Sequence, residues 1–239
     1  MSKPIPDGLV VLTFDDGCKS DIGNVAPLLK ESGFGATFFV NDPQKPWADW
    51  IPEHYLTWDD VAELHNAGFE IGNHTRNHPD VTTLSKAELV AELEYVEQRC
   101  EEHGVPRPTT FCYPGFHWNQ AAVEVLAEKG YAYARAGAPA GCEDKGSGCR
   151  GAAYDPAVHH PLLVPTTSYS GPDWGFDDLV WSLDQARDGK IAVLCFHGVP
   201  DLDHPWVHTD PEAFAKYMAY LAEAGCTVIA MRDLAQYTG

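Results

Sequence analysis

Two adjacent carboxylates, Asp15 and Asp16, directly follow the apolar run 9–14 (LVVLTF) and precede Gly17. Adjacent like charges repel each other unless a cation or a hydrogen-bond donor lies between them. Neighbouring side chains of an extended segment point to opposite sides, so the two carboxylates need separate roles or a bent backbone, which Gly17 permits. Taken alone, Asp-Asp-Gly is also typical of an ordinary turn.

Two histidines four residues apart, His74 and His78, lie in the polar segment 73–78 (NHTRNH). On a helical turn this spacing brings both imidazoles onto one face, at the separation that one zinc-sized ion needs. A pair at this spacing is also commonly incidental. An aspartate and two histidines together would make a facial metal triad with open positions for water and substrate.

A third polar position, His197, follows the apolar run 191–196 (IAVLCF). The ordinary pKa of a histidine suits a general acid that works near neutral pH. Asp173 precedes the helix before this strand, and its carboxylate can reach the imidazole and hold it protonated. A purely structural histidine at a strand end is the alternative.

Short apolar runs alternate with helical patterns along the whole chain, and three of the runs end at these clusters. The predicted strands are 9–13, 36–40, 70–72, 111–113, 191–196 and 226–230, and the predicted helices are 24–31, 57–67, 85–103, 119–129 and 211–224. Thr57 and Ser85 are the expected N-caps of two of these helices. The alternation favours a parallel sheet covered by helices, either a barrel or an open doubly wound sheet. In both folds, active sites lie at the carboxyl ends of the strands.

With 44% hydrophobic and 21% charged residues, the composition is that of a globular chain, and we expect a single domain over residues 1–239. Sixteen basic against 35 acidic side chains give a net charge of −19. This charge argues against a protein that binds nucleic acid or an anionic membrane through its whole surface.

The chain contains no apolar run of the length of a membrane helix, so we expect no membrane span. The first residues lack the apolar core and cleavage site of a signal peptide, which predicts a cytoplasmic protein. An extracytoplasmic location is expected instead if a signal has been removed. Among the seven cysteines, Cys142 and Cys149 enclose a glycine-rich part of the irregular stretch 137–169 and can pair under oxidising conditions.

The three clusters resemble the motifs of the polysaccharide deacetylase family, also known as the NodB homology domain or carbohydrate esterase family 4. TFDDG stands at 13–17, HTRNH at 74–78 and LCFH at 194–197, and the segment 28–40 (LLKESGFGATFFV) resembles the family's helix and second strand. The resemblance implies an α/β fold, a distorted (β/α) barrel of about seven parallel strands.

The resemblance also implies a metal-dependent hydrolase that removes acetyl groups from the nitrogen, or from the oxygen, of a carbohydrate. Asp16, His74 and His78 would hold a divalent ion, usually zinc, with cobalt or nickel tolerated. Asp15 would act as the base that takes a proton from metal-bound water. His197 would protonate the leaving amine.

Further family positions fall on residues of this chain. Asp173 would tune His197, and Trp174 with Leu194 would form the walls of a small pocket for the acetyl methyl group. The segment Tyr113-Pro114-Gly115 would contact the substrate, because Pro114 and Gly115 predict a tight turn that aims a backbone amide, of Gly115 or the next residue, at an oxyanion.

One departure from the family concerns its third motif, R-x-P-[YF]-G. Cys112 stands where its arginine would fall, and that arginine supports the catalytic base. We expect Arg135, in the segment 131–137, to take its place beside Asp15; an ordinary surface arginine is the alternative. Beyond the last motif, His204, Trp206 and His208 are expected at the rim of a sugar groove, or in a loop that caps the next helix.

The sequence thus predicts a deacetylase that acts on an acetylated amino sugar. One alternative is a related amidase for a small non-sugar amide, and another is a sugar-binding protein with a vestigial site.

Overall fold

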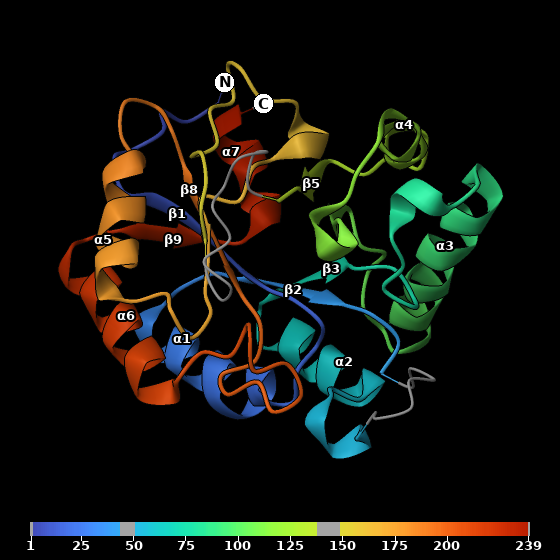
Figure 1. Cartoon of the computed structure of the whole chain (residues 1–239), viewed down its shortest axis with the longest axis horizontal. Helices are drawn as coiled ribbons and strands as arrows, with labels where there is room; N and C mark the ends of the chain where they lie inside the picture. The colour runs from blue at the N-terminus through green and yellow to red at the C-terminus, as the bar shows by residue number, and fades with distance from the viewer. Residues whose placement is uncertain (1, 44–50, 138–148, 239) are drawn as a thin grey trace.

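The computed structural model describes residues 2–43, 51–137 and 149–238. Its centre is a curled sheet in the order β5-β4-β3-β2-β1-β8-β7-β6, with β9 beside β1 (Figure 1). The strands are β1 (Leu9–Phe14), β2 (Thr37–Val40), β3 (Glu70–Asn73), β4 (Thr110–Cys112), β5 (Tyr133–Arg135), β6 (Cys149–Arg150), β7 (Ser168–Tyr169), β8 (Ala192–Phe196) and β9 (Thr227–Ile229).

The strands pair in parallel throughout the described sheet, except for the antiparallel pair β6–β7. The segment before β7 brings the two ends of the sheet together. The backbone amide of Val164 donates to Ala134 of β5, and that of Thr167 donates to Val193 of β8. The distorted, mostly parallel barrel predicted from the sequence is therefore confirmed.

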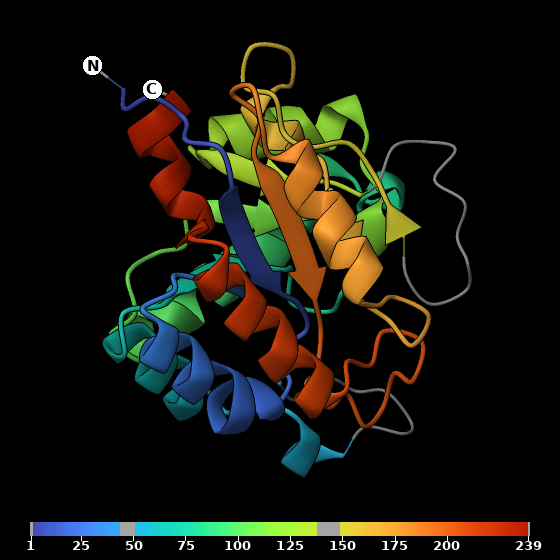
Figure 2. The ribbon, with the colours of Figure 1, turned by 90° about the vertical axis from the view of Figure 1, so that its left-hand side faces the viewer.

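Helices cover the outer face of the sheet. Figure 2 shows α5 and α6 packed in front of β1 and β8. The α-helices are α1 (Ala26–Ser32), α2 (Trp58–Asn66), α3 (Lys86–Glu102), α4 (Gln120–Glu128), α5 (Phe176–Gln185), α6 (Pro211–Glu223) and α7 (Ala235–Thr238). Shorter helical turns lie at Asp21–Val25, Pro52–His54, Val81–Thr83, Pro114–Phe116, Pro161–Leu163 and Met231–Leu234. None of the described helices is both long and apolar enough to span a membrane.

The helix starts follow from local capping. The hydroxyl of Thr57 accepts a hydrogen bond from the amide of Asp60, and that of Ser85 accepts one from the amide of Glu88. In each case the acidic side chain also accepts from the cap residue's amide, which completes a capping box. The predicted N-caps are confirmed.

Side chains of each strand alternate between the barrel interior and the helical layer. In β1, Leu9 and Val11 join the interior apolar cluster, whereas Val10, Leu12 and Phe14 pack with the helices. Because Phe14 faces the helices, the next residue, Asp15, faces the barrel interior.

The sequence reading missed β5, β6 and β7 as strands. Each contains only two or three residues, too few for a periodic pattern to be recognised. The cysteines Cys18, Cys100, Cys112, Cys195 and Cys226 are free thiols. Cys142 lies outside the described residues, so its pairing with Cys149 stays a prediction.

Candidate active site

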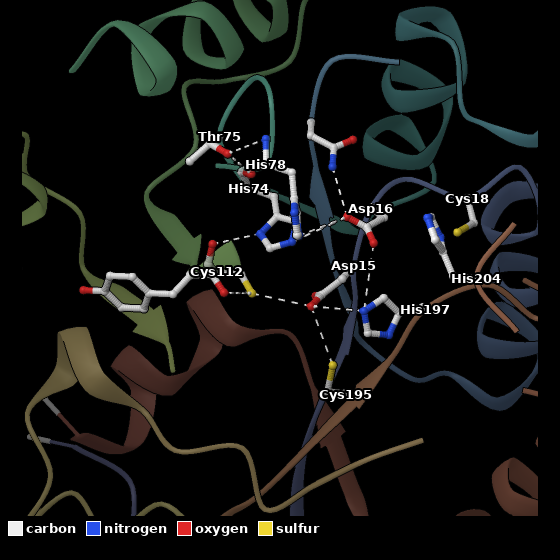
Figure 3. A network of polar contacts seen from close by, with 12 residues as sticks. Asp15, Asp16, Cys18, His74, Thr75, His78, Cys112, Cys195, His197 and His204 are labelled. Carbon is white, nitrogen blue, oxygen red and sulfur yellow. Dashed lines mark hydrogen bonds and ion pairs between the residues drawn. The ribbon is translucent and has the colours of Figure 1, made fainter. Parts of the chain in front are cut away.

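The three polar clusters meet at the carboxyl ends of β1, β3 and β8, as expected for a parallel barrel. Asp15, Asp16, His74, His78 and His197 all line one cavity of about 400 Å³. Figure 3 shows their side chains converging from separate strands. Segments that are distant in the sequence thus form one site.

Asp16, His74 and His78 form a group that can hold a metal ion. Oδ1 of Asp16 lies 3.6 Å from Nε2 of His74 and 3.7 Å from Nε2 of His78. Asp16 and His78 have positive φ angles of 72° and 53°, a left-handed backbone that non-glycine residues rarely adopt. Such strain occurs where function requires a particular side-chain direction.

Hydrogen bonds orient these three groups. Nδ1 of His74 lies 2.8 Å from the carbonyl oxygen of Cys112, so that nitrogen donates and Nε2 is left as the ligand atom. The side-chain amide of Asn41 donates a hydrogen bond to Oδ1 of Asp16 at 3.0 Å. The amide of His78 donates to the hydroxyl of Thr75 at 3.1 Å, which fixes the turn between the two histidines.

Burial, rather than a neighbouring charge, is the main reason that the pKa of His74 is lowered to about 4. The imidazole is therefore neutral near pH 7, which is the form that binds a metal ion. The donor set of two imidazoles and one carboxylate suits zinc and similar divalent ions. The residues present therefore fit the metal centre that the resemblance implies.

Arg135 is completely buried, and its guanidinium contacts Oδ2 of Asp15. The predicted contact between these two residues is thus present. Nη1 of Arg135 donates to the hydroxyl of Thr166 at 2.9 Å, and Nη2 lies 2.7 Å from Sγ of Cys112. The guanidinium is thereby held on the interior side of Asp15.

Burial raises the pKa of Asp15, but the positive charge of Arg135, together with smaller contributions from the imidazoles of His74 and His197 when they are protonated, more than offsets this, so the pKa of Asp15 lies below its usual value. Two thiols also surround the carboxylate. Sγ of Cys112 lies 3.5 Å and Sγ of Cys195 lies 3.6 Å from Oδ2 of Asp15. Asp15 is therefore ionised near neutral pH, as a general base requires.

His197 lies beside both carboxylates, with Nε2 at 4.0 Å from Oδ2 of Asp15 and 4.0 Å from Oδ2 of Asp16. Its other ring nitrogen, Nδ1, is buried without a hydrogen-bond partner among the described residues. Asp173 is exposed. The structure shows no hydrogen bond between Asp173 and this imidazole, so the tuning of His197 by Asp173 stays a prediction.

Trp174 and Leu194 do not line the cavity, which corrects the prediction that they wall an acetyl pocket. Both belong to the apolar cluster between the sheet and the helices, and Trp174 packs against Phe196 with ring centroids 5.7 Å apart. The strand alternation is the reason. Cys195 and His197 point into the barrel, so Leu194 must point outward.

The segment Tyr113-Pro114-Gly115 forms the predicted tight turn, with Gly115 at φ 57°. Tyr113 and Gly115 line the cavity, whereas Pro114 is buried beneath it. The hydroxyl of Tyr113 donates away from the cavity, to the carbonyl oxygen of Leu162 at 3.1 Å. The amide of Phe116 donates to the carbonyl oxygen of Tyr113 within the turn, which leaves Gly115 as the predicted oxyanion donor.

Apolar and aromatic side chains form the walls of the cavity. His204, Trp206 and Val207 line it from the loop after β8, and Phe116 and Tyr169 line it from the other side. Two members of the predicted rim are thus found at the cavity, whereas His208 is not among the lining residues.

Sequence reasoning also missed several contributors to the site. Asn41, Cys195, Tyr169 and Val207 carry no motif of their own. For Cys195 a signal did exist, since it lies two residues before His197 and must share its face of the strand.

The curled parallel sheet and its cavity define the class of protein: an α/β barrel whose interior groups of aspartate and histidine can hold a metal ion. The family model described as polysaccharide deacetylase matches residues 2–134. The chain belongs to this family, which confirms the resemblance.

Known relatives agree with this assignment. A chitin deacetylase of Colletotrichum lindemuthianum is 36% identical over 91 residues, which cover 38% of this chain and 35% of that protein. The matches span between 30% and 38% of the length of the first three curated relatives.

Solved structures show the same fold. A family 4 carbohydrate esterase from Streptomyces lividans, in complex with acetate, has a TM-score of 0.57 and 20% identity, over 93% of this chain and 92% of that one. Bacillus subtilis PdaA, also a family 4 carbohydrate esterase, has a TM-score of 0.60 and 18% identity, over 98% of this chain and 83% of that one.

Proposed function

We propose that this chain is a zinc-dependent hydrolase that releases acetate from an N-acetylated amino sugar. One observation carries the proposal: the ligand group Asp16–His74–His78 shares its cavity with an ionised carboxylate, Asp15, and an imidazole, His197. Amide hydrolysis needs a base for water, a positive charge for the oxyanion and an acid for the leaving amine.

A zinc-class ion supplies two of these needs when bound, because it lowers the pKa of water to roughly 7 and polarises the carbonyl group. Asp15 accepts a proton from water, since Arg135 keeps the carboxylate ionised. His197 donates a proton to the leaving nitrogen. The two residues divide the base and acid roles, so that one can be ionised while the other is protonated.

The cavity walls support a sugar substrate. Trp206, Tyr169 and Phe116 offer aromatic faces, which suit the apolar faces of pyranose rings. The net charge of −19 disfavours strongly anionic polymers and tolerates neutral or partly cationic amino sugars. Chitin deacetylases among the relatives point to the same substrate class.

The test measures acetate released from N-acetylated chito-oligosaccharides by the purified chain, supplemented with one equivalent of zinc, cobalt or nickel. We expect Asp15→Asn to abolish turnover and to retain the metal, and His74→Ala to lose both. Asp184→Asn is the matched control, because this exposed carboxylate lies on α5, outside the cavity, and pairs with the exposed Arg187.

Other outcomes identify the alternatives. Release of ammonia or an amine from small amides, without acetate from any sugar, identifies an amidase. Sugar binding without any hydrolysis identifies a vestigial site. Equal loss of metal in Asp15→Asn and His74→Ala contradicts the roles assigned here.

A further inference from the structure

A second group of ligand atoms lies beside the first in the same cavity. Asp15, Cys195 and His197 place a carboxylate oxygen, a thiol sulfur and a ring nitrogen within 4.8 Å of one another. We propose that this chain binds a second divalent cation through these three residues, and that Asp16 bridges it to the first cation.

The separations suit one small ion. Oδ2 of Asp15 lies 3.6 Å from Sγ of Cys195 and 4.0 Å from Nε2 of His197 (Figure 3). Metal–ligand bonds of about 2.0–2.3 Å in a tetrahedral site separate neighbouring ligand atoms by roughly 3.3–3.8 Å. Side-chain shifts of a few tenths of an ångström would therefore close the group around a cation.

The carboxylate of Asp16 faces both groups. Its Oδ1 is directed at His74 and His78, at 3.6 and 3.7 Å, and its Oδ2 is directed at Nε2 of His197, at 4.0 Å. A carboxylate whose two oxygens face different ligand sets is suited to bridge two cations. Pairs of metal ions in hydrolytic sites lie about 3.5–4 Å apart.

Electron pairs for this cation are available. Oδ1 of Asp15 is buried and has no hydrogen-bond partner among the described residues. Arg135 contacts the other oxygen, Oδ2. The cation would be bound through Oδ2, whose separations from Cys195 and His197 are given above, because the free Oδ1 can take over the arginine contact.

A third possible group, Asp15–His74–Cys112, is a poorer candidate. It shares His74 with the first group, and Nη2 of Arg135 lies 2.7 Å from Sγ of Cys112. The positively charged guanidinium of Arg135 lies where a cation bound to the thiol of Cys112 would have to lie. Among the described residues, Cys195 makes no hydrogen bond with the guanidinium, although it lies within its electrostatic influence, so its thiol is the one we assign.

Binding requires Cys195 to lose its proton, because the thiolate is the form that binds metal ions. The S–H bond breaks, a metal–sulfur bond forms, and one proton passes to solvent. Burial raises the pKa of this thiol, so only an ion with high affinity for sulfur displaces the proton at neutral pH. Zinc and cadmium meet this requirement, whereas magnesium and calcium do not.

The second cation would inhibit the reaction that we propose for this cavity, and this consequence rests on the proposed function. It would occupy Asp15 and His197 together, which are the base and the acid. Stoichiometric zinc would then support activity, and excess zinc would suppress it.

The test is a cadmium titration of the full chain at neutral pH, followed by thiolate-to-cadmium absorption and by proton release. We expect two equivalents of cadmium to bind. The thiolate-to-cadmium absorption and the release of one proton should accompany the binding of the second equivalent. Cys195→Ser should remove both signals and retain the first equivalent. His74→Ala should weaken the first equivalent, so a failure of the proposed metal centre is seen separately. Cys226→Ser is the control, because this half-buried thiol lies outside the cavity.

A second readout is the ratio of activity in excess zinc to activity in stoichiometric zinc, measured within each variant. Cys195→Ser should raise the zinc concentration needed for inhibition by about 10–100-fold. Unchanged absorption in Cys195→Ser, or loss of absorption in Cys112→Ser alone, overturns the proposal. A single equivalent of cadmium in the unmodified chain overturns it as well.

Discussion

Arg135 at the end of β5 and Asp15 at the end of β1 form a completely buried ion pair across the barrel, although 120 residues separate them in the sequence. Within the sheet, β4, β3 and β2 lie between these two strands. The pair therefore depends on the curling of the sheet into a barrel, and it fixes the proposed catalytic base, Asp15, to a distant strand.

Removing one partner of this pair should destabilise the protein strongly. Arg135→Gln leaves Asp15 charged in the interior, and we expect the free energy of unfolding to fall by about 3–5 kcal/mol. In the double variant Arg135→Gln/Asp15→Asn, the loss should be smaller than the sum of the two single losses. Urea denaturation of the four proteins measures this coupling, and additive losses would show that the pair is not coupled.

Removing the charge of Asp21 should stabilise the protein at neutral pH. This side chain is fully buried, and its carboxylate oxygens make no well-formed hydrogen bond among the described residues, apart from a weak contact with the backbone of Cys18. Burial, and then the negative charges of Asp201, Asp15 and Asp16, raise its pKa well above the usual value. We expect Asp21→Asn to increase the free energy of unfolding by about 1–3 kcal/mol at pH 8.

The sign of the pH dependence follows from the same shift. Below the pKa of the unfolded chain, near 3.9, Asp21 is protonated in both states and costs nothing. The cost grows as the pH rises from that value toward the raised pKa of the folded state. The gain from Asp21→Asn should therefore be near zero at pH 4 and largest at alkaline pH. A gain that is equal at pH 4 and pH 8, in thermal unfolding, would contradict this assignment.

Leu194 should matter for stability and not for substrate binding, because it packs between the sheet and the helices. Leu194→Ala should lower the free energy of unfolding by about 2–5 kcal/mol, the cost of a cavity in a packed core. KM should remain within about twofold of the original value. A large rise in KM, at temperatures where the variant is folded, would show that Leu194 contributes to substrate binding after all.

Trp206 should show the opposite behaviour. Its side chain lines the cavity and is 56% exposed, so its loss costs little packing. Trp206→Ala should raise KM about five- to tenfold, equivalent to about 1–1.4 kcal/mol of lost stacking, without a change in melting temperature. Steady-state acetate release measures KM, and calorimetry measures the melting temperature. An unchanged KM would show that Trp206 does not contact the substrate.

Metal removal should lower thermal stability, because a ligand that binds only the folded state stabilises it by mass action. At zinc concentrations about 100-fold above the dissociation constant, this contribution is about 2.7 kcal/mol. A chelator should therefore lower the melting temperature of the original chain and leave that of His74→Ala unchanged. His65→Ala, on α2 outside the cavity, should respond as the original chain does.

The sequence allowed the site to be predicted where residue type, spacing and strand ends coincide. Asp15, His74 and His197 each follow a recognisable apolar run, and the parallel barrel brings such ends together. The role of Arg135 beside Asp15 was predicted because the family's arginine is replaced by Cys112. The contact itself depends on the position of Arg135 inside the barrel, which no local sequence pattern reveals.

Other parts of the site were beyond sequence reasoning for two physical reasons. Trp174 and Leu194 were assigned to the pocket by the family resemblance, although strand alternation turns Leu194 outward. Tyr169 lies on a strand of two residues that exists only through its pairing with β8, a contact between distant segments. Asn41 reaches Asp16 from the end of β2, and neighbouring residues give no indication of that bond.

One edge of β1 is shared by two partners: Leu9–Val11 pair with β9, and Thr13 and Phe14 pair with β2. The strand that leads directly into Asp15 and Asp16 is therefore completed by a segment more than 200 residues further along the chain. Without β9, the backbone groups of Leu9–Val11 that pair with it would have no partner on this edge of β1. A variant truncated just before Thr227 would lack the partner of Leu9–Val11, so we expect it to lose the proposed hydrolytic activity although every motif residue is present.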